Sequence, residues 1–83
     1  MNKSDIEHIV KDFFVNELEF DAETISREAR LKEDIGVDSL DYVDIAVMVE
    51  EQLNFRMKPE ERRSITTFGE LCDYIAKNVI DHE

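Results

Sequence analysis

The residue of this chain best suited to chemistry is a serine, Ser39, within the segment 34–41, which reads DIGVDSLD. Gly36 suits a turn and Asp38 suits the N-cap of a helix, so Ser39 is expected in an exposed first helical turn. No histidine or lysine lies near it in sequence to act as a base, so its hydroxyl is a poor self-activated nucleophile. Ser39 is therefore suited to accept a group that another enzyme delivers. Its position alone leaves open the simpler alternative of a helix-start serine.

No other set of residues predicts catalysis. His8 and His82 are isolated in sequence, and the chain contains no HExxH, CxxC or GxSxG motif. The single cysteine, Cys72, excludes an internal disulfide framework. We therefore predict that the chain is not an enzyme and holds no metal ion.

Charge restricts the partners. The 83 residues contain 21 acids against 10 Lys and Arg, which gives a formal net charge of −11. Nucleic acids and anionic membranes would repel such a chain, so we expect neither, and basic proteins are the expected partners. No stretch approaches the roughly 20 apolar residues that span a bilayer, and no signal peptide is recognisable. The expectation is a single domain over residues 1–83, soluble, cytoplasmic and monomeric.

Three amphipathic helices should support Ser39. The first has apolar residues at helical spacing between positions 6 and 18, started by a capping box of Ser4 and Glu7. The second should run from about Asp38 to Leu53, with Asp41 three residues after its cap. The third should follow a capping box of Thr67 and Glu70. Its apolar stripe consists of Phe68, Leu71, Cys72, Ile75 and Val79.

The connections are less regular. Residues 19–37 show no sustained period and predict a long polar loop with a short turn near residues 24–27. Pro59 could open one short helical turn that ends at Arg63. No segment alternates for long enough to be a strand. The predicted fold is therefore all-α, a small antiparallel bundle with one long loop.

The second helix carries more apolar surface than one packed face needs. One stripe should face the core and comprises Tyr42, Ile45, Ala46, Val49 and Leu53. A second stripe of Leu40, Val43 and Val47 points away from the first. Residues 33–55 hold seven acids and no Lys or Arg. An apolar strip rimmed by acids predicts a docking surface for a basic partner, unless the long loop covers the strip.

With these features the chain resembles the acyl carrier proteins. The resemblance rests on residues 34–41 and on Glu50–Glu51, with further matches at 65–67 (ITT) and 73–75 (DYI). It covers most of the chain, from Ser4 to about Ile80. It implies a four-helix bundle whose third helix is short.

The resemblance also implies a cofactor and partners. Ser39 would carry a 4′-phosphopantetheine arm, attached from coenzyme A by a phosphopantetheinyl transferase with Mg²⁺, and the arm's thiol would hold acyl chains as thioesters. Ketosynthases, acyltransferases or ligases with basic patches would be the partner enzymes. The residues at the family's docking positions are Asp38, Leu40, Asp41, Val43, Asp44, Val47, Glu50 and Glu51. Candidate residues for an acyl pocket are Val49, Met57, Ile65, Leu71 and Tyr74, with ordinary core packing as the alternative.

The sequence departs from the common fatty-acid carriers around the third helix. Residues 54–59 (NFRMKP) replace a more acidic segment, and four cations outnumber Glu60 and Glu61 there, namely Arg56, Lys58, Arg62 and Arg63. This departure suggests a specialised carrier. Three hypotheses remain: a carrier for fatty-acid or related synthesis, a carrier of an aminoacyl or polyketide cargo, and an acidic helical adaptor without a prosthetic group.

Overall fold

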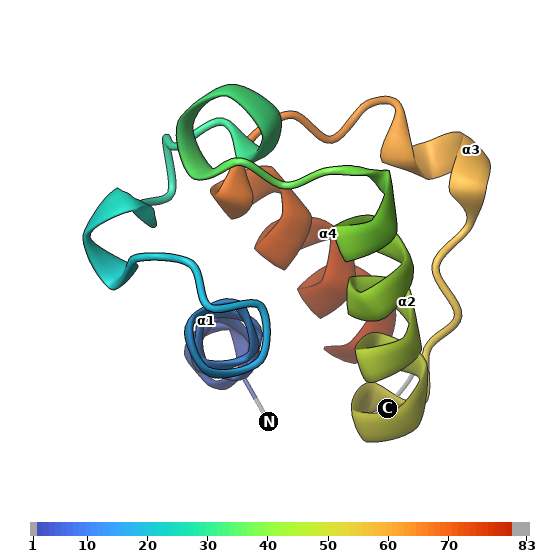
Figure 1. The fold of residues 1–83 in the computed structure, drawn as a ribbon. Coiled ribbons are helices and arrows are strands. Elements are labelled where there is room, and N and C mark those ends of the chain that lie inside the picture. The colour runs from blue at the N-terminus through green and yellow to red at the C-terminus, as the bar shows by residue number, and fades with distance from the viewer. Residues whose placement is uncertain (1, 81–83) are drawn as a thin grey trace.

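The structure, a computed structural model, describes residues 2–80 and is built from helices. The four α-helices are α1 (Lys3–Asn16), α2 (Ser39–Leu53), α3 (Pro59–Arg62) and α4 (Phe68–Ile80) (Figure 1). A 3-10 turn at Ala22–Thr24 and a π-helical turn at Leu31–Ile35 lie in the loop between α1 and α2. Within residues 2–80 no strand forms, and Arg30 and Thr67 make one isolated antiparallel bridge. The predicted all-α bundle with a short third helix is confirmed.

The start of α1 differs from the sequence prediction. Asn2, rather than Ser4, is the N-cap, and its side chain accepts a hydrogen bond of 2.9 Å from the backbone N–H of Asp5. The carboxylate of Asp5 in turn accepts the N–H of Asn2 at 3.0 Å. An Asn–Asp pair caps the free N–H groups at a helix start as well as a Ser–Glu pair does. The helix therefore begins at the Asn2–Asp5 pair, two residues before the predicted Ser4–Glu7 pair. Ser4 therefore lies inside the helix.

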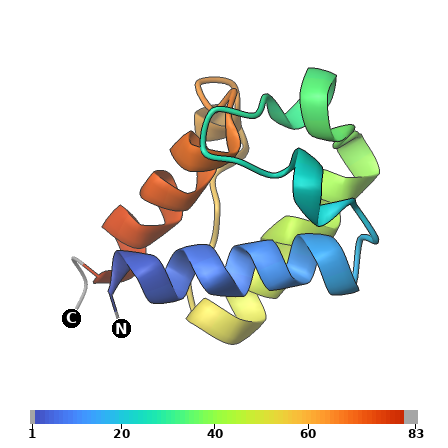
Figure 2. The ribbon, with the colours of Figure 1, turned by 90° about the vertical axis from the view of Figure 1, so that its left-hand side faces the viewer.

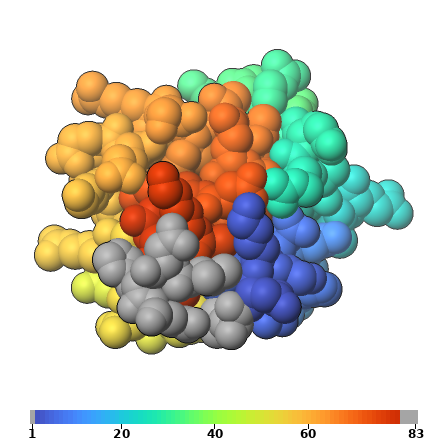
Figure 3. Space-filling view, turned by 180° about the vertical axis from the view of Figure 1, so that it is seen from behind, coloured from blue at the N-terminus to red at the C-terminus, as the bar shows by residue number. Residues whose placement is uncertain are grey.

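The core forms where α1, α2 and α4 meet. Ile6, Val10 and Phe14 of α1 are fully buried, and the ring of Phe14 meets that of Phe68 edge-on at 5.3 Å. α4 packs obliquely against α1, and the last turns of α4 lie beside the first turn of α1 (Figures 2 and 3). None of the helices within residues 2–80 is long and apolar enough to cross a membrane.

The loop between α1 and α2, which the sequence predicts to be polar, contributes apolar side chains to the core. Its buried side chains are Ile25, Ala29, Leu31, Ile35 and Val37. The backbone N–H of Leu31 donates to the carbonyl of Thr66 at 2.9 Å, which ties the π-helical turn to the segment before α4. The 3-10 turn also lies a few residues before the turn predicted at 24–27. These buried residues are spaced alternately by four and by two positions. That spacing fits neither a helix nor a strand, so periodicity could not identify them as core residues.

A seam joins this loop to the start of α4, and we use that word for residues 27–31 with residues 66–69. Across it, the N–H groups of Phe68 and Gly69 donate to the carbonyls of Ala29 and Arg27, each at 2.9 Å. A Cβ on Gly69 would lie 2.8 Å from the carbonyl oxygen of Arg27, so only glycine fits. The guanidinium of Arg27 also pairs with Glu7 of α1 and, at 2.8 Å, with Asp73 of α4.

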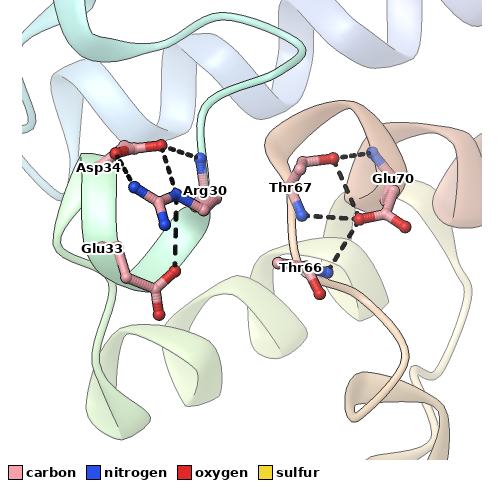
Figure 4. A network of polar contacts seen from close by, with 6 residues as sticks. All are labelled: Arg30, Glu33, Asp34, Thr66, Thr67 and Glu70. Carbon is pink, nitrogen blue, oxygen red and sulfur yellow. Dashed lines mark hydrogen bonds and ion pairs between the residues drawn. The ribbon is translucent and has the colours of Figure 1, made fainter.

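Two carboxylates are held near the seam by hydrogen bonds (Figure 4). Asp34 accepts from the side chain and the backbone N–H of Arg30, and these contacts lower the pKa of Asp34. Glu70 accepts from the N–H groups of Thr67 and Thr66, and these bonds lower the pKa of Glu70. Thr67 accepts the N–H of Glu70 in return, which confirms the capping box predicted for α4.

The one cysteine belongs to the core. Cys72 of α4 is 2% exposed and carries a free thiol. Burial, as the largest cause, raises the pKa of that thiol to about 12.

Candidate functional site

The start of α2 has the geometry that the sequence predicts. Asp38 is the N-cap, its carboxylate accepts the N–H of Asp41 at 2.9 Å, and the carboxylate of Asp41 accepts the N–H of Asp38 at 3.0 Å. Gly36, with φ of 100°, turns the chain in the left-handed region just before the cap. The capping box therefore fixes the position of Ser39 as the first residue of the helix, where it is exposed.

A cleft of about 500 Å³ opens beside Ser39. Its walls come from the π-helical turn, the first turn of α2 and the segment before α4. The lining residues are Leu31, Lys32, Glu33, Gly36, Val37, Asp38, Ser39, Tyr42, Ile65 and Thr66. One ammonium group and two carboxylates therefore line this cleft together with apolar side chains.

A smaller hollow of about 210 Å³ lies on the α3 side of Ser39. Four residues line it: Ser39, Tyr42, Arg62 and Arg63. The guanidinium carbon of Arg62 lies 5.2 Å from the centre of the Tyr42 ring, within the range of a cation–π contact. The sequence pattern did not link these residues to Ser39, because 20 residues separate Tyr42 from Arg62 and no periodicity spans that distance.

The second stripe of α2 is exposed along the helix. Leu40, Val43 and Val47 are 76%, 54% and 47% exposed, so the long loop does not cover them. Asp44, Glu50 and Glu51 are exposed around the strip, whereas Asp38 and Asp41 also cap the helix. Val47, Asp44 and Glu51 share a shallow hollow of about 300 Å³ with Phe13 and Leu18. An exposed apolar strip bordered by carboxylates thus runs down α2 from Ser39.

The five candidates for an acyl pocket lie in different surroundings. Ile65 lines the larger cleft beside Ser39. Val49, Met57 and Leu71 are buried members of the core, and Tyr74 packs against it. Tyr74 also receives the backbone N–H of Lys58 on its hydroxyl at 3.3 Å and meets the ring of Phe55 edge-on. The pocket therefore stays a prediction.

Few other groups with catalytic chemistry accompany Ser39 in the described part of the chain. Within residues 2–80 there is no cluster of three or more His, Cys, Asp and Glu that could hold a metal ion. His8 is exposed on α1, and His82 lies outside the described residues. The exposed Ser39 hydroxyl, with hollows on two sides, fits the attachment of a long flexible phosphodiester arm.

Comparisons with known proteins agree with this chemistry. The profile of the family described as "Phosphopantetheine attachment site" matches residues 8–75. The acyl carrier protein of Porphyromonas gingivalis is 36% identical over 76 residues, which cover 92% of this chain and 97% of that protein. The acyl carrier protein of Syntrophobacter fumaroxidans is 38% identical over 69 residues, which cover 83% of this chain and 85% of that protein.

A solved structure shows the same fold. The acyl carrier protein of Enterococcus faecalis superimposes with a TM-score of 0.76 at 22% identity, covering 94% of this chain and 99% of that chain. The arrangement of α1 to α4 is therefore that of a known helical carrier.

Proposed function

The chain belongs to the acyl carrier proteins of the phosphopantetheine attachment family, and from this premise we propose that Ser39 bears the 4′-phosphopantetheine arm. It is a carrier and not an enzyme. When bound, the arm supplies a thiol that holds an acyl group as a thioester. The observation that supports Ser39 as the attachment site is its exposure as the first residue of α2, beside two hollows. It also lies within residues 8–75, which the family model matches.

We expect a second protein to carry out the loading, because the carboxylates of the neighbouring Asp38 and Asp41 are engaged in capping α2 and are not arranged as a base for the Ser39 hydroxyl. A phosphopantetheinyl transferase would supply Mg²⁺ and the base that takes the proton of the Ser39 hydroxyl. The hydroxyl oxygen would then bond to the pantetheine-side phosphorus of coenzyme A, with adenosine 3′,5′-bisphosphate as the leaving group. The capping box holds the Ser39 backbone in place while its hydroxyl stays free for this transfer.

Intact mass tests the assignment. The wild-type protein, incubated with coenzyme A, Mg²⁺ and a broad-specificity transferase, should gain one phosphopantetheine, and Ser39→Ala should gain none. Ser26→Ala, a change at another exposed serine, should load like wild type. Ser39→Ala should change the free energy of unfolding by no more than about 0.5 kcal/mol, because the side chain is exposed. Loading of Ser39→Ala, or no loading of wild type by several transferases, would refute the proposal.

The apolar strip and its acids are proposed as the docking surface for partner enzymes. Leu40, Val43 and Val47 supply apolar contact that the other residues of 2–80 leave exposed. Asp38, Asp41, Asp44, Glu50 and Glu51 supply the opposing charge to a basic patch. Such charges mainly speed encounter and lose their effect in salt. The partners expected are the transferase and the ketosynthases, acyltransferases or ligases of the pathway.

Charge reversal tests the docking surface. Asp44→Lys with Glu51→Lys should lower kcat/KM for loading at low salt, and the loss should shrink as salt is raised. Glu23→Lys with Glu28→Lys makes the same change in net charge at exposed acids of the long loop and should have much less effect. Equal losses in the two double variants would mean that net charge, and not this surface, matters.

The cargo we propose is a fatty acyl chain or a related unit. The relatives named acyl carrier protein favour it, and an aminoacyl or polyketide unit is the other candidate. The mass of the thioester on protein purified from its native cell distinguishes the two.

A further inference from the structure

The smaller hollow beside Ser39 brings two arginines to the attachment point. Arg62 ends α3 and Arg63 follows it, and the N–H of Ile65 closes this turn onto the carbonyl of Arg62 at 3.1 Å. Ile65 is buried, so the turn that follows the arginines is anchored to the core. In Figures 1 and 2, α3 lies at the same end of the bundle as the start of α2. The backbone that carries the two arginines is thus held in place by packing.

These arginines have no acidic partner among the described residues. Lys58 lies 4.0 Å from Glu61, and Arg27 and Arg30 pair with acids of their own, but Arg62 and Arg63 form no ion pair within residues 2–80. Arg62 is half-buried and rests on the face of Tyr42. A stacked guanidinium still directs its N–H groups outward in the plane of the fork, where they can bind an anion.

The start of α2 itself cannot serve an anion well. Helix starts commonly bind phosphate through free N–H groups. Here the carboxylates of Asp38 and Asp41 already accept the N–H groups of Asp41 and Asp38. A phosphodiester on Ser39 would therefore meet two negative charges at the helix start, so cations from other segments would favour its binding.

The two hollows beside Ser39 differ in the charge that they offer. The larger cleft contains Lys32 together with Glu33 and Asp38. The smaller one contains Arg62 and Arg63 and no carboxylate. A phosphodiester is stabilised on the side where positive charge is in excess, and that side is α3.

We propose that Arg62 and Arg63, supported by the ring of Tyr42, form an anion site that holds the phosphodiester of the group carried on Ser39. The inference rests on the proposed role of Ser39. It assigns to α3 a positioning function: the two arginines set the direction in which the arm leaves α2, toward α3 and away from the Glu33 side. They also offset the charge that loading adds to an acidic surface.

Phosphorus NMR of the loaded protein tests the anion site. The variants are Arg62→Gln with Arg63→Gln, and a control of Arg56→Gln with Lys77→Gln, which removes the same charge at exposed positions that do not line the hollow. Each protein is loaded with coenzyme A and the transferase, and its intact mass is recorded first. The ³¹P resonance of each is then compared with its position in denaturing urea, and circular dichroism confirms that each variant is folded.

The wild-type resonance should lie away from its urea position and move toward it as NaCl rises to about 1 M, where the Debye length is about 3 Å. The Arg62→Gln/Arg63→Gln resonance should lie close to the urea position at low salt, and the control should match wild type. Arg62→Lys with Arg63→Lys should restore part of the displacement, because charge returns without the fork geometry.

Two results would overturn the anion site while leaving Ser39 in place. One is a loaded wild-type protein whose resonance coincides with the urea position. The other is an equal displacement in the Arg62→Gln/Arg63→Gln protein and in wild type. A wild-type mass without phosphopantetheine would instead remove the role of Ser39 itself, and the anion site with it.

Discussion

The seam and the surface around Ser39 use similar kinds of residue in opposite ways. In the seam, Arg27 joins three segments through Glu7 and Asp73, and a glycine brings two backbones together. Around Ser39, Arg62 and Arg63 have no acidic partner within residues 2–80, and apolar side chains are exposed along α2. Arg27 therefore stabilises the fold, whereas Arg62 and Arg63 line a hollow at the surface.

This difference separates stability from function. Buried contacts and backbone hydrogen bonds hold the seam, so changes there act on unfolding. Ser39, Leu40 and Val43 are exposed, so substitutions there can alter the binding of a partner or of a carried group at small cost in stability. Four substitutions or sets of substitutions test this division, ordered by the expected effect on the free energy of unfolding.

Phe68→Ala should have the largest effect. The ring is 2% exposed, packs edge-on against Phe14 at 5.3 Å, and begins α4 at the seam. Loss of a buried aromatic ring typically costs about 3–5 kcal/mol. Urea unfolding measures it, and a loss under about 1 kcal/mol would show that the seam is not the stable part of the fold.

Gly69→Ala should destabilise by about 1–3 kcal/mol, as overpacking does. Its new methyl group would meet the carbonyl oxygen of Arg27 at 2.8 Å, and a backbone atom cannot move aside as a flexible side chain can. Lys77→Ala, an exposed position on the same helix, should stay within about 0.5 kcal/mol. Thermal unfolding of the two variants measures the difference, and equal midpoints for Gly69→Ala and Lys77→Ala would contradict the prediction.

Acid should weaken the polar contacts near the seam. The pKa values of Asp34 and Glu70 are lowered in the folded protein, whereas those of the unfolded chain lie near about 3.9 and 4.3. The unfolded state therefore binds more protons in this range, and the stabilisation, complete above about pH 5, is lost as pH falls through the folded pKa values.

A double variant isolates this pH effect. Asp34→Asn with Glu70→Gln should flatten the fall of the urea midpoint between about pH 5 and pH 3 relative to wild type. Asp12→Asn with Glu28→Gln, at exposed acids with no ion pair within residues 2–80, controls for net charge and should keep the wild-type slope. Parallel curves for wild type and Asp34→Asn/Glu70→Gln would contradict the assignment.

The smallest change in stability is expected at the strip. Leu40→Ser and Val43→Ser should each alter the free energy of unfolding by about 0.5 kcal/mol or less, because both side chains are exposed. The same variants should raise KM for partner enzymes if the strip is the docking surface. Steady-state kinetics with the transferase, together with urea unfolding, give both readings. A large loss of stability with an unchanged KM would show that the strip serves stability and not docking.

The sequence predicted best what depends on local rules. Asp38 and Asp41 correctly predicted the N-cap of α2, and Thr67 with Glu70 correctly predicted the start of α4, because capping depends on side chains three positions apart. The same rule misplaced the start of α1, where both Asn2–Asp5 and Ser4–Glu7 satisfy it.

What depends on distant partners could not be predicted. The π-helical turn at Leu31–Ile35 is tied to Thr66, and the stacking of Arg62 on Tyr42 joins residues with no shared periodicity. The exposure of Leu40, Val43 and Val47 was also open until the path of the long loop was known. Helix faces follow from spacing, whereas what covers a face follows from the whole fold.

The burial of Cys72 has a consequence for cargo. Thioesters pass readily to another thiolate, so a carrier with a reactive cysteine of its own would lose acyl groups from the arm to its own chain. Burial raises the pKa of the Cys72 thiol far above neutral pH, so the thiol stays protonated, and its sulfur is enclosed by the core. The helical core thus keeps the chain's single cysteine out of acyl exchange. Acyl transfer to and from partner enzymes is then left to the thiol of the phosphopantetheine arm.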